Sequence, residues 1–127
     1  MRTVITDIGA ALGCGAVMSS LRRTKSGSFD ISHAYTLEEI EQMSYEERIS
    51  RLLPLETAFS DVEKLALPSF FATLCKNGCE VYLKKIGKDY DIGTRLKLYD
   101  GNEFFALGEV KEYPNGKAVK MIKLFSL

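Results

Sequence analysis

The sequence has little of what several classes of protein require. Of its 127 residues one is histidine and three are cysteine, and the formal net charge is zero. Three cysteines without the dense spacing of a disulfide scaffold favour a reducing compartment, so we expect a cytoplasmic protein. One histidine and one close cysteine pair, Cys75 and Cys79, supply too few ligands for a tetrahedral zinc site, so we expect no metal. No stretch approaches the roughly 20 apolar residues of a membrane span, and the N-terminus has no signal-peptide core.

The length of 127 residues suits one ordinary domain or two small ones, and 46% of the residues are hydrophobic and can build a core. A net charge of zero gives the whole chain no bulk field for capturing nucleic acid. The charges are nevertheless unevenly distributed. The middle of the chain is acidic, whereas lysine and arginine outnumber aspartate and glutamate from Lys76 onward. The C-terminal part is therefore mildly basic.

The N-terminal half reads as helix, strand and two short helices. Apolar residues at helical spacing predict a helix over residues 3–12, which Gly13 ends. The small and apolar residues 16–21 predict a buried strand that delivers Arg22, Arg23 and Lys25 at its end. Such a cluster suits phosphate oxygens, although a solvated strand end fits the charges equally well. Capping boxes at Thr36 and Ser44 predict short helices that reach about residues 43 and 51.

In the C-terminal half, apolar and polar residues alternate with a period of two, which is typical of strands. After a connector with short extended pieces over residues 55–67, Pro68 precedes a predicted helix over 69–76 that ends at Asn77-Gly78. Alternating residues then predict four strands over residues 80–83, 94–99, 104–111 and 118–125. Turn sequences between the last three strands favour an antiparallel meander. A sheet this small must curl into a barrel to cover its apolar face, so we predict an α+β fold with a boundary between residues 66 and 67.

Several short motifs follow one another along the chain. The first thirty residues hold Arg2-Thr3-Val4-Ile5-x-Asp7-Ile8-Gly9, Leu12-Gly13-Cys14-Gly15-Ala16 and Leu21-Arg22-Arg23-Thr24-x-x-Gly27-x-Phe29. Later come Thr36-Leu37-Glu38-Glu39, Leu53-Pro54-Leu55-Glu56-Thr57-Ala58, Asn77-Gly78 and Phe105-Ala106-Leu107-Gly108-Glu109-Val110. In order and spacing these residues resemble the C-terminal third of the bacterial tRNA pseudouridine synthase B (TruB) family. The last motif is similar to the strand signature of that family's PUA-type RNA-binding domain.

The resemblance implies a fold, a reaction and a partner. Residues 1–66 would be the C-terminal portion of the synthase catalytic domain and residues 67–127 a small PUA-like β-barrel. The family isomerises uridine 55 in the T loop of tRNA to pseudouridine, by flipping the base into a pocket where an aspartate attacks and no cofactor is needed. That aspartate lies in a Gly-x-Leu-Asp motif, which these 127 residues do not contain. We therefore expect a truncated C-terminal piece that contacts the T-arm of tRNA and is inactive alone.

The resemblance also suggests individual roles. Arg2 matches the arginine that pairs with the catalytic aspartate, Leu21 matches a residue lining the cleft, and Arg22 and Arg23, with Lys25 beside them, would face RNA. In the PUA-like part we expect RNA contacts, on charge alone, from Lys84, Lys85, Lys88, Arg95 and Lys97. Plainer interpretations stay open: Arg2 as a disordered terminus, Leu21 as core, and the later cations as a solvated face.

Three hypotheses follow. The chain is the RNA-contacting part of a tRNA pseudouridine synthase, a stand-alone PUA-like RNA-binding module, or a protein-interaction fragment. The third is motivated by the helix over residues 3–12, whose Val4, Ile5 and Ile8 have few local residues to cover them.

Overall fold

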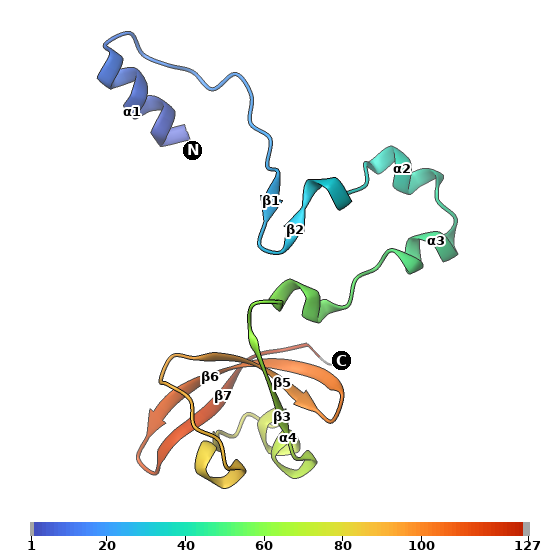
Figure 1. Cartoon of the computed structure of the whole chain (residues 1–127), viewed down its shortest axis with the longest axis vertical. Coiled ribbons are helices and arrows are strands. Elements are labelled where there is room, and N and C mark those ends of the chain that lie inside the picture. The colour runs from blue at the N-terminus through green and yellow to red at the C-terminus, as the bar shows by residue number, and fades with distance from the viewer. Residues whose placement is uncertain (1, 126–127) are drawn as a thin grey trace. The chain divides into compact units, whose positions relative to one another are not determined.

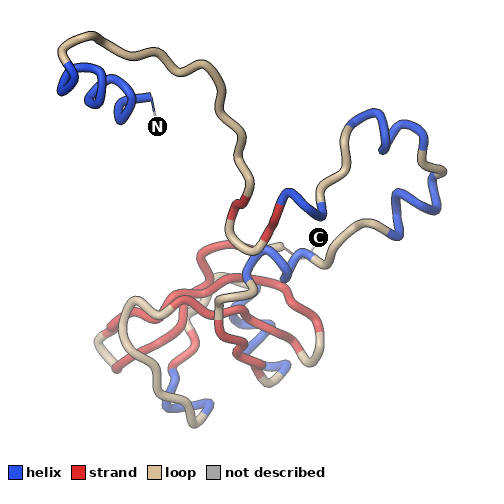
Figure 2. The backbone as a smooth tube through the Cα atoms, turned by 45° about the horizontal axis from the view of Figure 1, so that its top comes forward, coloured by secondary structure: helices blue, strands red, loops and turns tan. Residues whose placement is uncertain are grey.

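The computed structural model describes residues 2–125. They form two compact units, one ending at Met43 and the other beginning at Ser44, and each unit is described by itself. Figure 1 labels their helices and strands, and Figure 2 marks the strands in red.

The first unit begins with helix α1, Arg2–Leu12, as predicted. Gly13 follows with a φ of 71°, the left-handed conformation that ends a helix at no Cβ cost. The strands β1, Lys25–Ser26, and β2, Phe29–Asp30, then form a short antiparallel hairpin. A 3-10 turn, Ile31–His33, and helix α2, Leu37–Gln42, complete the unit.

The predicted buried strand over residues 16–21 is wrong. Residues 15–24 have no regular secondary structure, and the side chain of Val17 is 90% exposed. A strand needs a neighbour to satisfy its backbone groups, and no described strand pairs with residues 16–21. These residues favour an extended backbone, but without a partner strand they do not form a buried strand.

A close backbone crossing holds the end of α1. The amide of Gly15 donates a hydrogen bond of 3.1 Å to the carbonyl of Gly9, and Gly9 is the buried residue of the helix. A Cβ at Gly9 would lie 2.3 Å from the backbone nitrogen of Ala16. Only glycine therefore allows the returning chain to lie against the helix at this point.

Both predicted capping boxes are present. In α2 the Thr36 hydroxyl accepts from the Glu39 amide at 3.2 Å, and the Glu39 carboxylate accepts from the Thr36 amide at 2.7 Å. In α3, Tyr45–Ser50, Ser44 and Glu47 make the same pair of bonds at 3.2 and 2.8 Å. The boxes satisfy amides that a helix start otherwise leaves free.

The second unit contains a curled five-stranded sheet in the order β3-β5-β6-β7-β4. Strands β5, β6 and β7 form the predicted antiparallel meander. Strand β4 pairs with β7, and β3 runs parallel to β5. The bounds are Glu63–Leu67 for β3, Val81–Tyr82 for β4, Arg95–Asp100 for β5, Glu103–Tyr113 for β6 and Gly116–Leu124 for β7.

The connector predicted over residues 55–67 is more ordered than expected. It contains a 3-10 helix, η2, Leu55–Phe59, and then the edge strand β3. Leu65 and Leu67 alternate into the core and make β3 a half-buried strand. The sequence predicts short extended pieces here but not that one of them joins the sheet, because its parallel partner β5 lies far away in sequence and local pattern gives no sign of the pairing. The proposed boundary between residues 66 and 67 falls within β3.

The core lies between the inner face of the curled sheet and helix α4, Ser69–Lys76. Pro68 is the N-cap of this helix and Gly78 follows its end with a φ of 84°. A 3-10 helix, η3, Leu83–Ile86, closes one end of the core. The fully buried side chains include Leu65, Leu83, Leu96, Leu98, Phe105, Val110 and Val119. The half-barrel so formed, with its helices, confirms the predicted α+β class.

Because side chains alternate along a strand, the sheet has a second face, which we call the outer face. It carries the residues between the core positions: Lys64 and Ala66 in β3, Arg95, Lys97 and Tyr99 in β5, Phe104, Leu107, Glu109 and Lys111 in β6, and Lys120 and Lys123 in β7. This face and the η3 region hold all the cations predicted to contact RNA in the second unit.

Candidate nucleic-acid interface

The N-terminal basic run is fully open to solvent. Leu21, Arg22 and Arg23 are exposed in the irregular segment before the hairpin, with the Leu21 side chain 62% exposed. Lys25 lies in β1, directly opposite Asp30. A shallow pocket of about 200 Å³ is lined by Arg23 and Lys25 together with Phe29, Asp30 and Ile31. The structure thus brings two of the four predicted residues into one depression and leaves Leu21 and Arg22 outside its lining.

Asp30 gives this hairpin a fixed negative charge. Its carboxylate accepts hydrogen bonds from the Ser32 amide at 2.9 Å and the Ser32 hydroxyl at 2.7 Å. These bonds, the backbone one first, hold the pKa of Asp30 below its ordinary value. A phosphate approaching Arg23 and Lys25 would therefore meet a negatively charged neighbour, which weakens the clamp expected from the cations alone.

Arg2 lies in the first turn of α1 and is exposed. Its carbonyl accepts a bond of 3.2 Å from the Thr6 hydroxyl. The sequence interpretation of Arg2 as a disordered terminus does not hold, because the residue is helical. Its role beside a catalytic aspartate remains a prediction.

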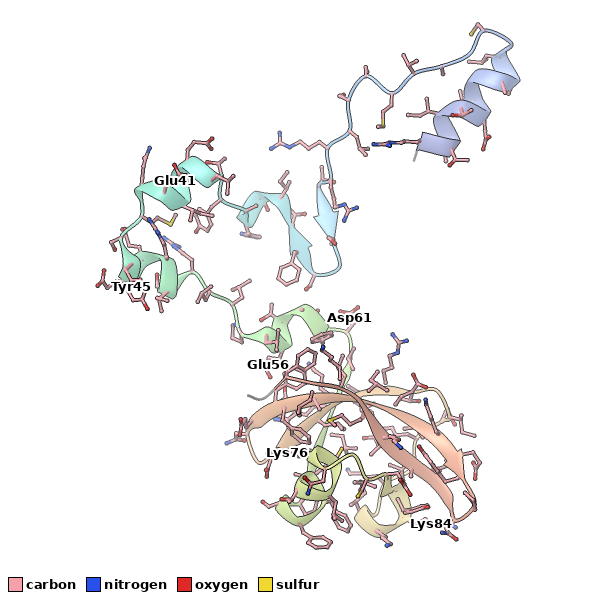
Figure 3. The ribbon with its side chains drawn as sticks, turned by 180° about the vertical axis from the view of Figure 1, so that it is seen from behind. Glu41, Tyr45, Glu56, Asp61, Lys76 and Lys84 are labelled. Carbon is pink, nitrogen blue, oxygen red and sulfur yellow. The ribbon has the colours of Figure 1, made fainter. Side chains whose placement is uncertain are left out.

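Two of the predicted lysines, Lys84 and Lys85, lie in η3, and Lys88 follows it in the chain. Lys84, labelled in Figure 3, and Lys88 line a pocket of about 480 Å³ together with Lys117, Asp89 and Glu112. The Lys117 ammonium donates to Asp89 at 2.9 Å, and this bond raises the pKa of Lys117.

Cations and carboxylates nearly balance in this pocket, and Lys85 lies outside its lining with its ammonium 5.7 Å from the centre of the Tyr82 ring. The site is mixed in charge rather than strongly basic.

Arg95 and Lys97 belong to a different surface, the outer face. The pairing register aligns Lys64, Lys97, Leu107 and Lys123 in one row across four strands. A neighbouring row places Arg95 opposite Glu109 and Glu109 opposite Lys120. The predicted cations are therefore divided between two regions, with Arg95 and Lys97 separated from the η3 lysines.

Sequence reasoning missed four cations of the outer face: Lys111 in β6, and the three in β3 and β7, which are Lys64, Lys120 and Lys123. Lys120 and Lys123 lie in a strand that was predicted, so alternation along β7 could have placed them beside Lys97. Lys64 could not be found in this way because the short extended pieces predicted over residues 55–67 have no predicted partner strand. The register between strands, which no local pattern specifies here, is what brings the three together.

One carboxylate moderates the outer face. Glu109 lies 3.8 Å from the Arg95 guanidinium and 3.5 Å from the Lys111 ammonium. Within residues 2–125, no carboxylate lies within 4 Å of Lys97, Lys120 or Lys123. Three outward lysines are thus available to an external anion.

An aromatic cluster closes one end of the outer face. Phe59, Tyr99, Phe104 and Phe125 have ring centroids 5.4 to 6.0 Å apart in successive pairs. The Tyr99 hydroxyl donates to the carboxylate of Glu56, which Figure 3 shows in the short helix leading to the sheet. Burial and then this bond raise the pKa of Tyr99 to about 12. The contacts dock η2 onto the sheet, and the Lys64 ammonium lies 3.8 Å above the Tyr99 ring.

Two other kinds of feature, a metal site and a membrane-spanning helix, are absent from residues 2–125. Within residues 2–125, no group of three or more His, Cys, Asp or Glu side chains is placed to hold a metal ion. Over the same residues, no helix combines the length and apolar character that crossing a membrane requires.

The fold is of the α+β class and ends in a half-barrel with a basic outer face. Comparison with known proteins indicates which family the sequence resembles. Residues 2–60 match the sequence model of the tRNA pseudouridylate synthase B C-terminal domain. A Clostridium tetani (strain Massachusetts / E88) protein named tRNA pseudouridine synthase B is 34% identical over 122 residues, covering 96% of this chain and 41% of that protein. A protein of the same name from Alkaliphilus oremlandii (strain OhILAs) is 34% identical over 127 residues, covering 98% and 42%. One from Burkholderia mallei (strain NCTC 10247) is 34% identical over 105 residues, covering 81% and 35%.

These matches confirm the resemblance seen in the motifs: the chain is similar to the C-terminal region of tRNA pseudouridine synthase B proteins. It spans about two fifths or less of the length of the curated relatives it matches.

Proposed function

We propose that this chain is the tRNA-contacting C-terminal part of a tRNA pseudouridine synthase that converts uridine 55 of the T loop to pseudouridine. Residues 1–66 would complete the catalytic domain and residues 67–127 would form the PUA-like RNA-binding domain, with the whole of β3, which crosses this boundary, belonging to the sheet of the latter. The observation that carries the proposal is the match, at 34% identity over 96% of the chain, to a protein named tRNA pseudouridine synthase B. The exposed basic run and the outer face support it, since both offer cations to phosphate.

The roles of individual residues follow the same proposal. Arg2 would pair with a catalytic aspartate supplied by residues outside this sequence, and Leu21 would line the cleft. Arg22, Arg23 and Lys25 would contact the T-arm. The 127 residues contain no Gly-x-Leu-Asp motif, so we expect them to bind tRNA without isomerising it.

Two assays test the proposal. Filter binding of labelled tRNA at low salt should show retention that falls steeply as salt rises, because each neutralised phosphate releases counterions. Tritium release from uridine-labelled tRNA should stay at the level of the protein-free control. No retention at low salt would overturn the RNA-contact role, and tritium release would overturn the predicted inactivity.

A second candidate function, association with another protein, is favoured by the apolar surface of the first unit. Val4 and Ile8 of α1 are each 52% exposed, and Leu12 is 71% exposed. Exposed apolar groups on one helix suit a protein neighbour. Fluorescent-dye binding that disappears in Val4→Ser/Ile8→Ser would support this surface. Equal dye binding by the wild type and the variant would contradict it.

A further inference from the structure

We propose that the outer face of the sheet binds the phosphate backbone of duplex RNA and is the main RNA-contacting surface of the second unit. This inference deepens the proposed function and rests on it. The outer face combines strands that are far apart in sequence, β3 with β5, β6 and β7, which Figure 1 shows as one continuous curled sheet. The surface therefore exists only in the folded chain.

The charge balance distinguishes this face from the η3 region. Six cations lie on the outer face: Lys64, Arg95, Lys97, Lys111, Lys120 and Lys123. Two carboxylates accompany them, Glu109 in β6 and Glu56 of η2, which accepts a hydrogen bond from Tyr99. In the pocket beside η3, by contrast, Lys84, Lys88 and Lys117 share their surroundings with Asp89 and Glu112. Since the field at a surface follows the sum of its charges, the outer face attracts a polyanion more strongly.

The arrangement of the cations indicates the form of the polyanion. Neighbouring strands lie about 4.8 Å apart, so Lys64 and Lys123 lie roughly 14 Å apart across the sheet. Arg95 and Lys97 are about 7 Å apart along their strand. The cations thus cover a two-dimensional patch rather than a single track. A patch of this kind can contact both backbones of a double helix, which a one-stranded RNA does not present.

The aromatic residues point the same way. Single-stranded RNA is bound largely by stacking bases on open aromatic rings. Tyr99 is only 4% exposed, and Phe104 is packed between the rings of Phe59, Tyr99 and Phe125. These rings are engaged with one another and with η2, so they offer no free platform for a base. The face is built for phosphate contact that is independent of sequence.

The test compares two triple variants of the full 127-residue chain that remove the same charge. Lys97→Gln/Lys120→Gln/Lys123→Gln alters the outer face, and Lys84→Gln/Lys85→Gln/Lys88→Gln alters the η3 region. The probes are an RNA hairpin with a long duplex stem and a single-stranded RNA of equal length. Affinity is measured over a series of salt concentrations, and circular dichroism checks that each variant is folded.

For the duplex probe, the outer-face variant should lose about tenfold or more in affinity near 0.1 M salt. Its salt slope, the steepness with which log affinity falls against log salt concentration, should decrease by about 2 to 3. The η3 variant should change the slope less. Lys97→Arg/Lys120→Arg/Lys123→Arg, which keeps the charge, should restore most of the wild-type slope.

Three results would overturn the inference. They are a wild-type slope in the folded outer-face variant, an η3 variant that loses as much or more, and single-stranded RNA bound as tightly as the duplex. Each of these leaves the proposed function intact, since the wild type still binds RNA. Failure of the wild type to bind either probe would instead refute the RNA-contact role itself.

Discussion

Replacing Gly108 by alanine should destabilise the second unit. Gly108 lies on the inner side of β6, and a Cβ there would be 2.7 Å from Val119 Cγ2 and 2.9 Å from Leu98 Cδ1. Carbon atoms pack best at roughly 3.5 to 4.0 Å, so the added methyl group overlaps both side chains. Val119 and Leu98 are fully buried and have no free space into which to move.

The change in unfolding free energy caused by Gly108→Ala is the sum of two opposing effects. Overpacking a close-packed core costs about 1–3 kcal/mol, and replacing a strand glycine by alanine returns about 0.5–1 kcal/mol because the unfolded chain is less free. The net loss should be about 1–2 kcal/mol of unfolding free energy, or roughly 5 to 15 °C in Tm for a unit of this size. Far-UV circular dichroism during thermal and urea unfolding measures both.

A second substitution makes the test specific. Val119→Ala alone should cost about 1–3 kcal/mol because it leaves a cavity. In the Gly108→Ala/Val119→Ala double variant the new methyl group partly fills that cavity, so the combined loss should fall short of the sum by about 1 kcal/mol. A Gly108→Ala protein as stable as the wild type, or strictly additive losses, would refute the packing argument.

Three further predictions concern local bonds. Because the folded-state pKa of Tyr99 is raised from 10.0 to about 12, its contribution to stability is present below pH 10 and is lost as the pH rises from 10 to about 12. Tyr99→Phe should therefore make the fall in the free energy of urea unfolding over this pH range less steep, and an equally steep fall in the variant would contradict this. Gly9→Ala should speed amide exchange at Gly15 by breaking the crossing, although alanine favours a helix by about 1 kcal/mol elsewhere; unchanged exchange would refute the crossing. Ser44→Ala should weaken α3 by about 1 kcal/mol, seen as faster amide exchange at Glu47, whereas Ser44→Asp should retain the cap; equal exchange in the two variants would count against it.

The candidate site was only partly predictable. The basic run from Arg22 to Lys25 is a contiguous stretch and could be read directly from the sequence. The surface around Lys97 could not, because its members come from separate strands and meet only through pairing register. Charge alone also grouped Arg95 and Lys97 with the η3 lysines, although the fold places them in different surroundings. Charges near in sequence can thus face different ways, while distant ones share a surface.

Local chemistry by itself determined the short-range features of this protein. The helix over residues 2–12, its glycine stop, the capping boxes at Thr36 and Ser44 and the meander of β5, β6 and β7 all depend on neighbours a few residues away, so pattern and propensity suffice to predict them. Tertiary structure alone decided that residues 16–21 remain irregular, that β3 joins the sheet in parallel, and that Lys64, Lys97 and Lys123 form one row. A strand exists only where a partner satisfies its backbone, and the choice of partner is a property of the whole fold.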